Sequence, residues 1–261
     1  MINLEELTLF LLITTADSTF VDGIRLNDDI LIYMPLLKKF IFNIESTVSC
    51  PNTQITRLSN EDIQLSFIGR IYEEVGSYIQ TNSTNDERKC HIYSLPYQFK
   101  VLYYRSYSFH GDMFRYVQRL FIINFRPFER NFFEIISQNF PLLEKLFIDN
   151  HEPQRDKQQS TTFIMFPHLI LLNLNFSHID YAEQFLIDEN CYFPRLFHLG
   201  ISYESLSTVT HNFTNDATRF NCAKVTDLEI LEPFVRPKNF DEYFPVCKWH
   251  IYYNIFMYTG L

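Results

Sequence analysis

The sequence predicts an α/β fold in which strand–loop–helix units of about 27 residues stack side by side as a repeat array, or solenoid. Three observations predict it: one six-residue apolar pattern recurs along the chain, its copies are almost evenly spaced, and a proline precedes many of them. A single unit of this size cannot bury its apolar face alone, so neighbouring units must cover it. We expect one mostly parallel, curved sheet with helices on its convex side.

The pattern reads apolar, x, x, apolar, x, apolar, and it predicts eight strands. Its middle apolar residues are Leu7, Phe40, Tyr93, Leu120, Leu146, Leu172, Leu199 and Leu228. Successive middle positions differ by 33, 53, 27, 26, 26, 27 and 29 residues, so five consecutive gaps are nearly equal. The gap of 53 holds either a degenerate repeat or an insertion within residues 43–89. A weak ninth copy begins at Cys247, with His250 in the middle. An ordinary α/β sheet is the alternative, but it gives no reason for constant spacing.

Between the strands the apolar period changes from two residues to about 3.6, which indicates helices. Helical faces are expected within residues 128–140 and 181–186, with a shorter turn at 240–244. The longest helix is expected over residues 60–80, where apolar residues stand four apart: Ile63, Phe67, Ile71, Val75 and Ile79. Polar stretches at 81–89 and 150–162 predict exposed loops. A proline stands two residues before the first apolar position of five copies, where it ends a helix and leads into a strand: Pro35, Pro141, Pro167, Pro194 and Pro245.

Composition and charge exclude several classes of protein. Hydrophobic residues make up 46% of the 261 residues, which is typical of a folded chain. The chain has 22 Lys and Arg against 31 Asp and Glu, which gives a net charge of −9. The sequence contains no basic cluster of the kind that binds nucleic acid, so we expect no nucleic-acid partner. The longest uncharged apolar runs are shorter than the ~20 residues of a membrane helix. No signal peptide is recognised, and five widely spaced cysteines fit reduced thiols. We expect a cytoplasmic protein, with the nucleus left open.

Motifs that carry chemistry are not found in the sequence. There is no glycine-rich phosphate loop, no Cys/His spacing of a metal site and no Gly-x-Ser-x-Gly elbow. We therefore expect no cofactor, no metal and no enzymatic activity. A hydrolase with Cys191 or Cys222 as nucleophile is a distant alternative, because either thiol would need a histidine close in space.

The Leu-x-x-Leu-x-Leu core at this period resembles the leucine-rich repeat, in its longer helix-containing form. Residues 90–99, 126–133 and 232–240 look like the repeat region of F-box/leucine-rich-repeat-like proteins. The asparagine that the family carries eight residues after the first apolar position is replaced here by Gln98, Phe125, His151, Ser177, Glu204 and Pro233. We therefore expect the backbone groups of the loops to be hydrogen-bonded differently.

The resemblance implies one leucine-rich-repeat domain over residues 1–261, with about eight degenerate repeats, and a role in binding proteins. It implies in particular the substrate-recognition part of an F-box-type ubiquitin-ligase adaptor. The F-box itself is not seen, because Leu4 already lies on a predicted strand. We expect a monomeric fragment of a longer chain, which reaches the ubiquitin-ligase core if an F-box lies upstream. A free-standing repeat scaffold without a ligase link is the alternative.

The candidate binding surface is the concave face of the predicted sheet. In each strand the anchors point inward, so the alternate residues point to that face. The candidate partner-binding residues are Arg119, Phe121, Ile123, Lys145, Phe147, Asp149, Asn173 and Asn175. Phe121 and Phe147 occupy equivalent positions on neighbouring strands, and aromatic and arginine side chains are frequent interface hot spots. The alternative is that a loop covers both phenylalanines and they belong to the core.

Overall fold

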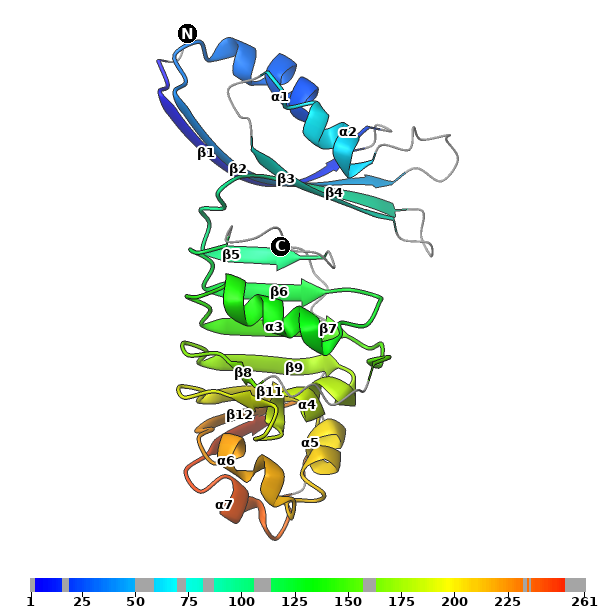
Figure 1. The fold of residues 1–261 in the computed structure, drawn as a ribbon, viewed down its shortest axis with the longest axis vertical. Coiled ribbons are helices and arrows are strands. Elements are labelled where there is room, and N and C mark those ends of the chain that lie inside the picture. The colour runs from blue at the N-terminus through cyan, green and yellow to red at the C-terminus, as the bar shows by residue number, and fades with distance from the viewer. Residues whose placement is uncertain are drawn as a thin grey trace. The chain divides into compact units, whose positions relative to one another are not determined.

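The computed structural model describes residues 3–15, 19–49, 59–69, 74–81, 87–105, 114–156, 163–231, 234 and 236–251. The chain forms two compact units, Met1–Gln98 and Phe99–Leu261. Their main sheets are separate, with four strands in the first unit and seven in the second (Figure 1). The single repeat domain expected from the sequence therefore divides in front of Phe99.

The first unit is a four-stranded sheet with short helices. Its elements are β1 (Glu6–Thr15), α1 (Gly23–Asp29), the 3-10 helix η1 (Leu31–Tyr33), β2 (Lys39–Ser49), α2 (Asn60–Leu65), β3 (Val75–Thr81) and β4 (Glu87–Ser94). The strand order is β1-β2-β4-β3. β1 and β2 run parallel and pair Leu7 with Phe40, so the first two copies of the pattern are confirmed as neighbouring parallel strands.

The copy of the pattern at Tyr93 is not a further parallel strand. β4 pairs antiparallel with both β2 and β3. The loop expected over residues 81–89 is shorter than predicted, because β3 extends to Thr81 and β4 begins at Glu87. Residues 82–86 lie outside the described residues.

The long helix expected over residues 60–80 is also wrong. α2 ends at Leu65 and β3 begins at Val75, while Ile71 lies outside the described residues. Gly69 has a φ of 73°, a left-handed conformation that favours glycine and does not continue a helix. The spacing of four is shared by a helix face and by one side of a strand, so it did not separate the two.

The second unit contains a seven-stranded, entirely parallel sheet. Its main strands are β5 (Val101–Tyr104), β6 (Arg119–Ile123), β7 (Lys145–Asn150), β9 (Leu171–Ser177), β11 (His198–Ile201), β12 (Asp227–Ile230) and β13 (Lys248–Ile251). They lie side by side in the order of the sequence, as the repeat pattern predicts. Among the described strands β5 and β13 are open edges, so the sheet is not a closed barrel.

The register of this sheet confirms the predicted spacing. The middle leucines of five copies are direct partners across the strands, in the order Leu120, Leu146, Leu172, Leu199 and Leu228. All five side chains are fully buried. Repeats of nearly constant length place the same position at the same height on each strand, so one row of leucines forms the centre of the core.

At both ends of the sheet the predicted middle residue is wrong. Leu102, not Tyr93, pairs with Leu120. Trp249, not His250, pairs with Leu228, so His250 lies in the neighbouring row of the strand. The pattern also fits Leu102, because Phe99 and Tyr104 complete it, and this copy lies 18 residues before Leu120 instead of 27.

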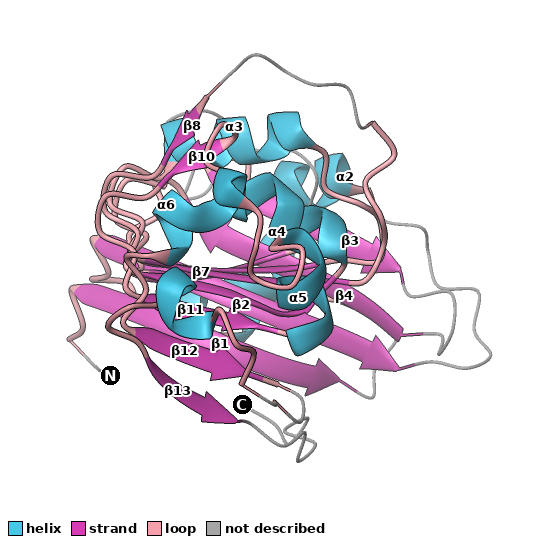
Figure 2. Ribbon diagram, turned by 90° about the horizontal axis from the view of Figure 1, so that it is seen from below, coloured by secondary structure: helices cyan, strands magenta, loops and turns pink. Residues whose placement is uncertain are grey.

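The helices of this unit lie over one face of the sheet (Figure 2). They are α3 (Arg130–Asn139), α4 (Ile179–Leu186), α5 (Tyr203–Val209), the 3-10 helix η2 (Asp216–Thr218), α6 (Arg219–Cys222) and α7 (Phe240–Tyr243), and the short strands β8 (Ile164–Met165) and β10 (Cys191–Tyr192) pair separately. Phe133 of α3 packs against Phe185 of α4 with ring centroids 4.8 Å apart. In the described part of the chain, no helix has the length and apolar character to span a bilayer.

Asparagines bridge neighbouring repeats, one residue before the position at which the repeat pattern predicts them. The Asn150 amide donates to the Arg126 carbonyl at 2.6 Å, and its side-chain oxygen accepts from the Glu152 N–H at 2.9 Å. Asn124 likewise donates to the carbonyl of Arg105 at 2.8 Å. Both asparagines are buried, and each satisfies a loop carbonyl of the preceding repeat.

Candidate functional site

The open face of the seven-stranded sheet presents side chains in straight rows. The register places Val101, Arg119, Lys145, Leu171, His198, Asp227 and Lys248 in a first row. Two residues further along each strand lies a second row, made of Tyr103, Phe121, Phe147, Asn173, Gly200, Glu229 and His250. The helices cover the opposite face, where the leucine row is buried (Figure 2).

Three aromatic rings stack at one end of the second row. Tyr103 and Phe121 have centroids 4.7 Å apart with planes 16° from parallel. Phe121 and Phe147 are closer, at 4.3 Å and 8°. All three side chains are partly exposed, so they are neither core residues nor isolated surface residues. We call these three residues the aromatic ladder. Its spacing confirms that equivalent residues of adjacent repeats lie one strand apart.

The predicted binding residues lie on this face with different exposure. Arg119 is exposed, Asn175 is buried, and the others are partly exposed. Arg119 and Lys145 are direct neighbours in the first row, beside the aromatic ladder. The register shifts after Phe147, where β7 and β9 are irregularly paired.

A polar network fills the other end of the face. The Asn175 amide donates to Glu229 at 2.7 Å, across the intervening strand β11. His198 lies between two carboxylates, with Nδ1 2.8 Å from Asp227 and Nε2 3.6 Å from Glu229. His250 approaches the same Asp227 at 3.5 Å. Asn175 was a predicted binding residue, but it is buried and its side-chain nitrogen is bonded within the network.

Gly200 allows this network to form. A Cβ atom at Gly200 would lie 2.6 Å from the side-chain nitrogen of Asn173 and 3.0 Å from that of Asn175. Both amides therefore lean over the bare backbone of β11, and Asn175 reaches β12. A side chain at this position would displace them.

The network changes the protonation of its histidine. Glu229 and Asp227 stabilise the charged imidazole and raise the pKa of His198 above its usual value, against partial burial, which lowers it. An imidazole held between carboxylates can change charge near neutral pH. In the described part of the chain the partners of His198 are carboxylates, and neither the hydroxyl nor the thiol of a nucleophile is among them.

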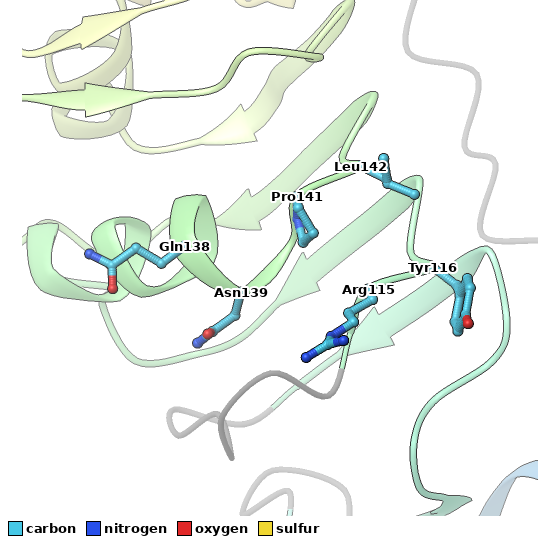
Figure 3. A pocket seen from close by; sticks show the side chains of 6 residues that line it. All are labelled: Arg115, Tyr116, Gln138, Asn139, Pro141 and Leu142. Carbon is cyan, nitrogen blue, oxygen red and sulfur yellow. The ribbon is translucent and has the colours of Figure 1, made fainter.

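A hollow of about 310 Å³ has no residue of either row among its described lining residues, which Figure 3 shows. Its lining residues are Arg115, Tyr116, Gln138, Asn139, Pro141 and Leu142, which come from the turn before β6, the end of α3 and the turn before β7. None of them is a carboxylate, an imidazole or a thiol. Among the described lining residues, none is suited to general-base catalysis near neutral pH.

The two cysteines considered as nucleophiles are fully buried. Burial raises the pKa of the Cys191 thiol to about 12 and raises that of Cys222 as well. Both are therefore protonated at neutral pH and hidden from substrates. The described residues contain no group of three or more His, Cys, Asp or Glu placed to hold a metal ion.

Two features of the site were missed by sequence reasoning. Tyr103 completes the aromatic ladder, and the apolar pattern around Leu102 was the signal for its strand. The link between Asn175 and Glu229 has no sequence signal, because 54 residues separate the two partners.

Comparison with known protein families, curated proteins and solved structures finds no match to this chain.

Proposed function

We propose that the chain is a protein-binding module of the leucine-rich-repeat type, and that the open face of its seven-stranded sheet receives the partner. The main support for this proposal is the aromatic ladder, whose three partly exposed rings lie together on a face that the helices leave open. Clustered aromatic side chains beside an arginine are frequent centres of protein interfaces.

The regular repeat supports this proposal. Strands in sequence order, leucines in register and the asparagine bridges between loops are the features that a leucine-rich-repeat solenoid requires. The same resemblance leads us to propose a specific role, the substrate-recognition part of an F-box-type ubiquitin-ligase adaptor. A free-standing scaffold would use the same face without a ligase link.

Affinity purification of the tagged full-length gene product tests the proposal. The comparison is between the wild type, Phe121→Ala/Phe147→Ala and the control Phe197→Ala, which removes a 45% exposed ring that is outside both rows. We expect cross-linked partners, quantified by mass spectrometry, that the double variant loses and the control retains. The linker protein of the ligase core among them would favour the adaptor role.

An identical set of partners for all three chains would overturn the proposed binding face. Partners that depend on the ladder without any ligase component would favour the scaffold. Labelling of Cys191 or Cys222 in the folded chain by an activity-based thiol probe would favour the hydrolase, which the burial of both thiols argues against.

A further inference from the structure

We propose that the aromatic ladder and the cation pair Arg119–Lys145 together accept a partner segment that carries an Asp or Glu side chain beside an apolar side chain. This inference rests on the proposed binding function and specifies the chemistry of the partner. It follows from the charges around the ladder. The sequence predicts Arg119 and Lys145 beside Phe121 and Phe147, and in the structure neither cation forms an ion pair with a described residue.

The two cations are side by side, and neither has a counterion in the part of the chain that the structure describes. Arg119 and Lys145 are direct partners in the parallel pairing of β6 and β7. Within the described residues, neither side chain has an ion pair or a side-chain hydrogen bond. Like charges directly opposite each other in a sheet are destabilising. A carboxylate placed between them would relieve this repulsion.

The surrounding strands do not supply that carboxylate. Asp149 is the only acidic residue of β5, β6, β7 and β9. It lies four residues along β7 from Lys145, a distance of about 13 Å in an extended strand. In a chain with a net charge of −9, two neighbouring cations without counterions are unexpected on composition alone.

The distance between the cations and the rings determines the spacing in the partner. Arg119 precedes Phe121 by two residues, and Lys145 precedes Phe147 by two. Two residues along a strand cover about 7 Å. An extended partner segment with an acidic residue two positions from an aromatic or aliphatic residue matches this distance. We therefore infer an acidic and apolar segment as the occupant.

A basic partner segment fits the face less well. The carboxylates of the second half of the face, Asp227 and Glu229, already contact His198, His250 and Asn175. Lys248 lies next to Asp227 in the first row and adds positive charge there. Arg119 and Lys145 are the only Lys or Arg residues of β5, β6 and β7, and both lie beside the ladder.

A peptide selection tests the partner chemistry. Random 12-residue peptides displayed on phage are selected on the full chain, and fluorescein-labelled copies of the enriched peptides are measured by anisotropy. We expect enriched sequences with Asp or Glu two positions from an apolar residue. Arg119→Gln/Lys145→Gln should bind them about ten-fold more weakly, because two exposed ion pairs are lost. Added salt should weaken binding to the wild type as well.

The matched control is Arg195→Gln/Lys238→Gln, which removes two exposed cations elsewhere and changes the net charge equally. It should bind like the wild type. Each single variant, Arg119→Gln and Lys145→Gln, serves as a second test, and thermal melting shows that all variants are folded.

The outcomes separate this inference from the proposed function. Peptides that need Phe121 but bind Arg119→Gln/Lys145→Gln with the same affinity as the wild type would overturn the inference of an acidic partner. The proposed binding face would still stand. Peptides that ignore both the ladder and the cations, or no enrichment at all, would count against both proposals.

Discussion

Replacing single residues of the aromatic ladder with alanine measures how much each ring contributes to the free energy of unfolding. Phe121 stacks on two rings, at 4.7 and 4.3 Å, whereas Phe147 stacks on Phe121 at the end of the ladder. Leu146 lies next to Phe147 in the chain but points to the other face and is fully buried. Alanine at each of these three positions therefore compares a central ring, a terminal ring and a core residue.

The structure gives the expected order of destabilisation. Leu146→Ala should lower the free energy of unfolding by about 3 kcal/mol, since it removes buried methyl groups and leaves a cavity. Phe121→Ala should cost about 2 kcal/mol, from two ring contacts of about 0.5 kcal/mol each and the loss of a half-buried ring. Phe147→Ala should cost about 1 kcal/mol, because it loses one ring contact.

Urea denaturation followed by the fluorescence of Trp249 gives these values. Trp249 is the single tryptophan of the chain and belongs to β13, so it reports on the second unit. A double-mutant cycle between Phe121 and Phe147 should give a coupling of about 0.5–1 kcal/mol for the stacked pair.

Two results would refute this reasoning. Phenylalanine variants as unstable as Leu146→Ala would show that both rings are core residues and that the face is covered. A coupling of zero between Phe121 and Phe147 would show that the rings do not stack in solution.

Three further predictions concern the repeat and the polar network. Gly200→Ala should destabilise the second unit by about 1–2 kcal/mol in urea denaturation, because its Cβ displaces the Asn173 amide and breaks the link across β11. Asn150→Ala should cost about 2 kcal/mol in the same assay, since the carbonyl of Arg126 loses its buried donor. His198→Gln should reduce the melting temperature more at pH 6 than at pH 8.5: the raised pKa of His198 gives stability that is complete below the unfolded pKa of about 6.5 and lost as pH rises through the folded pKa.

Each of these predictions has a result that contradicts it. A Gly200→Ala chain with wild-type stability would mean that Asn173 and Asn175 do not lean over β11. An Asn150→Ala chain as stable as the control Asn131→Ala, at an exposed position of α3, would show that Asn150 does not bridge the repeats. A melting-temperature difference for His198→Gln that is equal at both pH values would show that the two carboxylates do not hold the charged imidazole.

Much of the second unit could be predicted from the sequence, for a physical reason. Each repeat must bury its own leucine against the next, so Leu120, Leu146, Leu172, Leu199 and Leu228 recur at nearly constant spacing. Spacing then determines strand order, register and the placement of Phe121 beside Phe147. Strand order and register follow from the same short apolar pattern in every repeat, so the pattern is sufficient to predict them.

Where the local sequence fitted two structures equally well, only the pairing between strands decided which one formed. Val75 and Ile79 fit a helix face as well as a strand, and pairing with β4 made them a strand. Tyr93 fitted the repeat spacing better than Leu102, yet antiparallel pairing with β2 placed Tyr93 in the first unit. Tyr93 pairs with Asn43, 50 residues away in the sequence, whereas β4 is the next strand after β3 and decides its conformation by antiparallel pairing.

The sequence by itself determined the stacked parallel strands and which residues face away from the core, because alternation and period express burial directly. It did not determine the contacts made across that outer face. Asn175 reaches Glu229 only because Gly200 leaves the strand between them without a side chain. Arg119 and Lys145 are neighbours in the sheet, and no acidic side chain of the described residues forms an ion pair with either. Such contacts depend on distances between residues far apart in the chain, and these distances exist only once the sheet has formed.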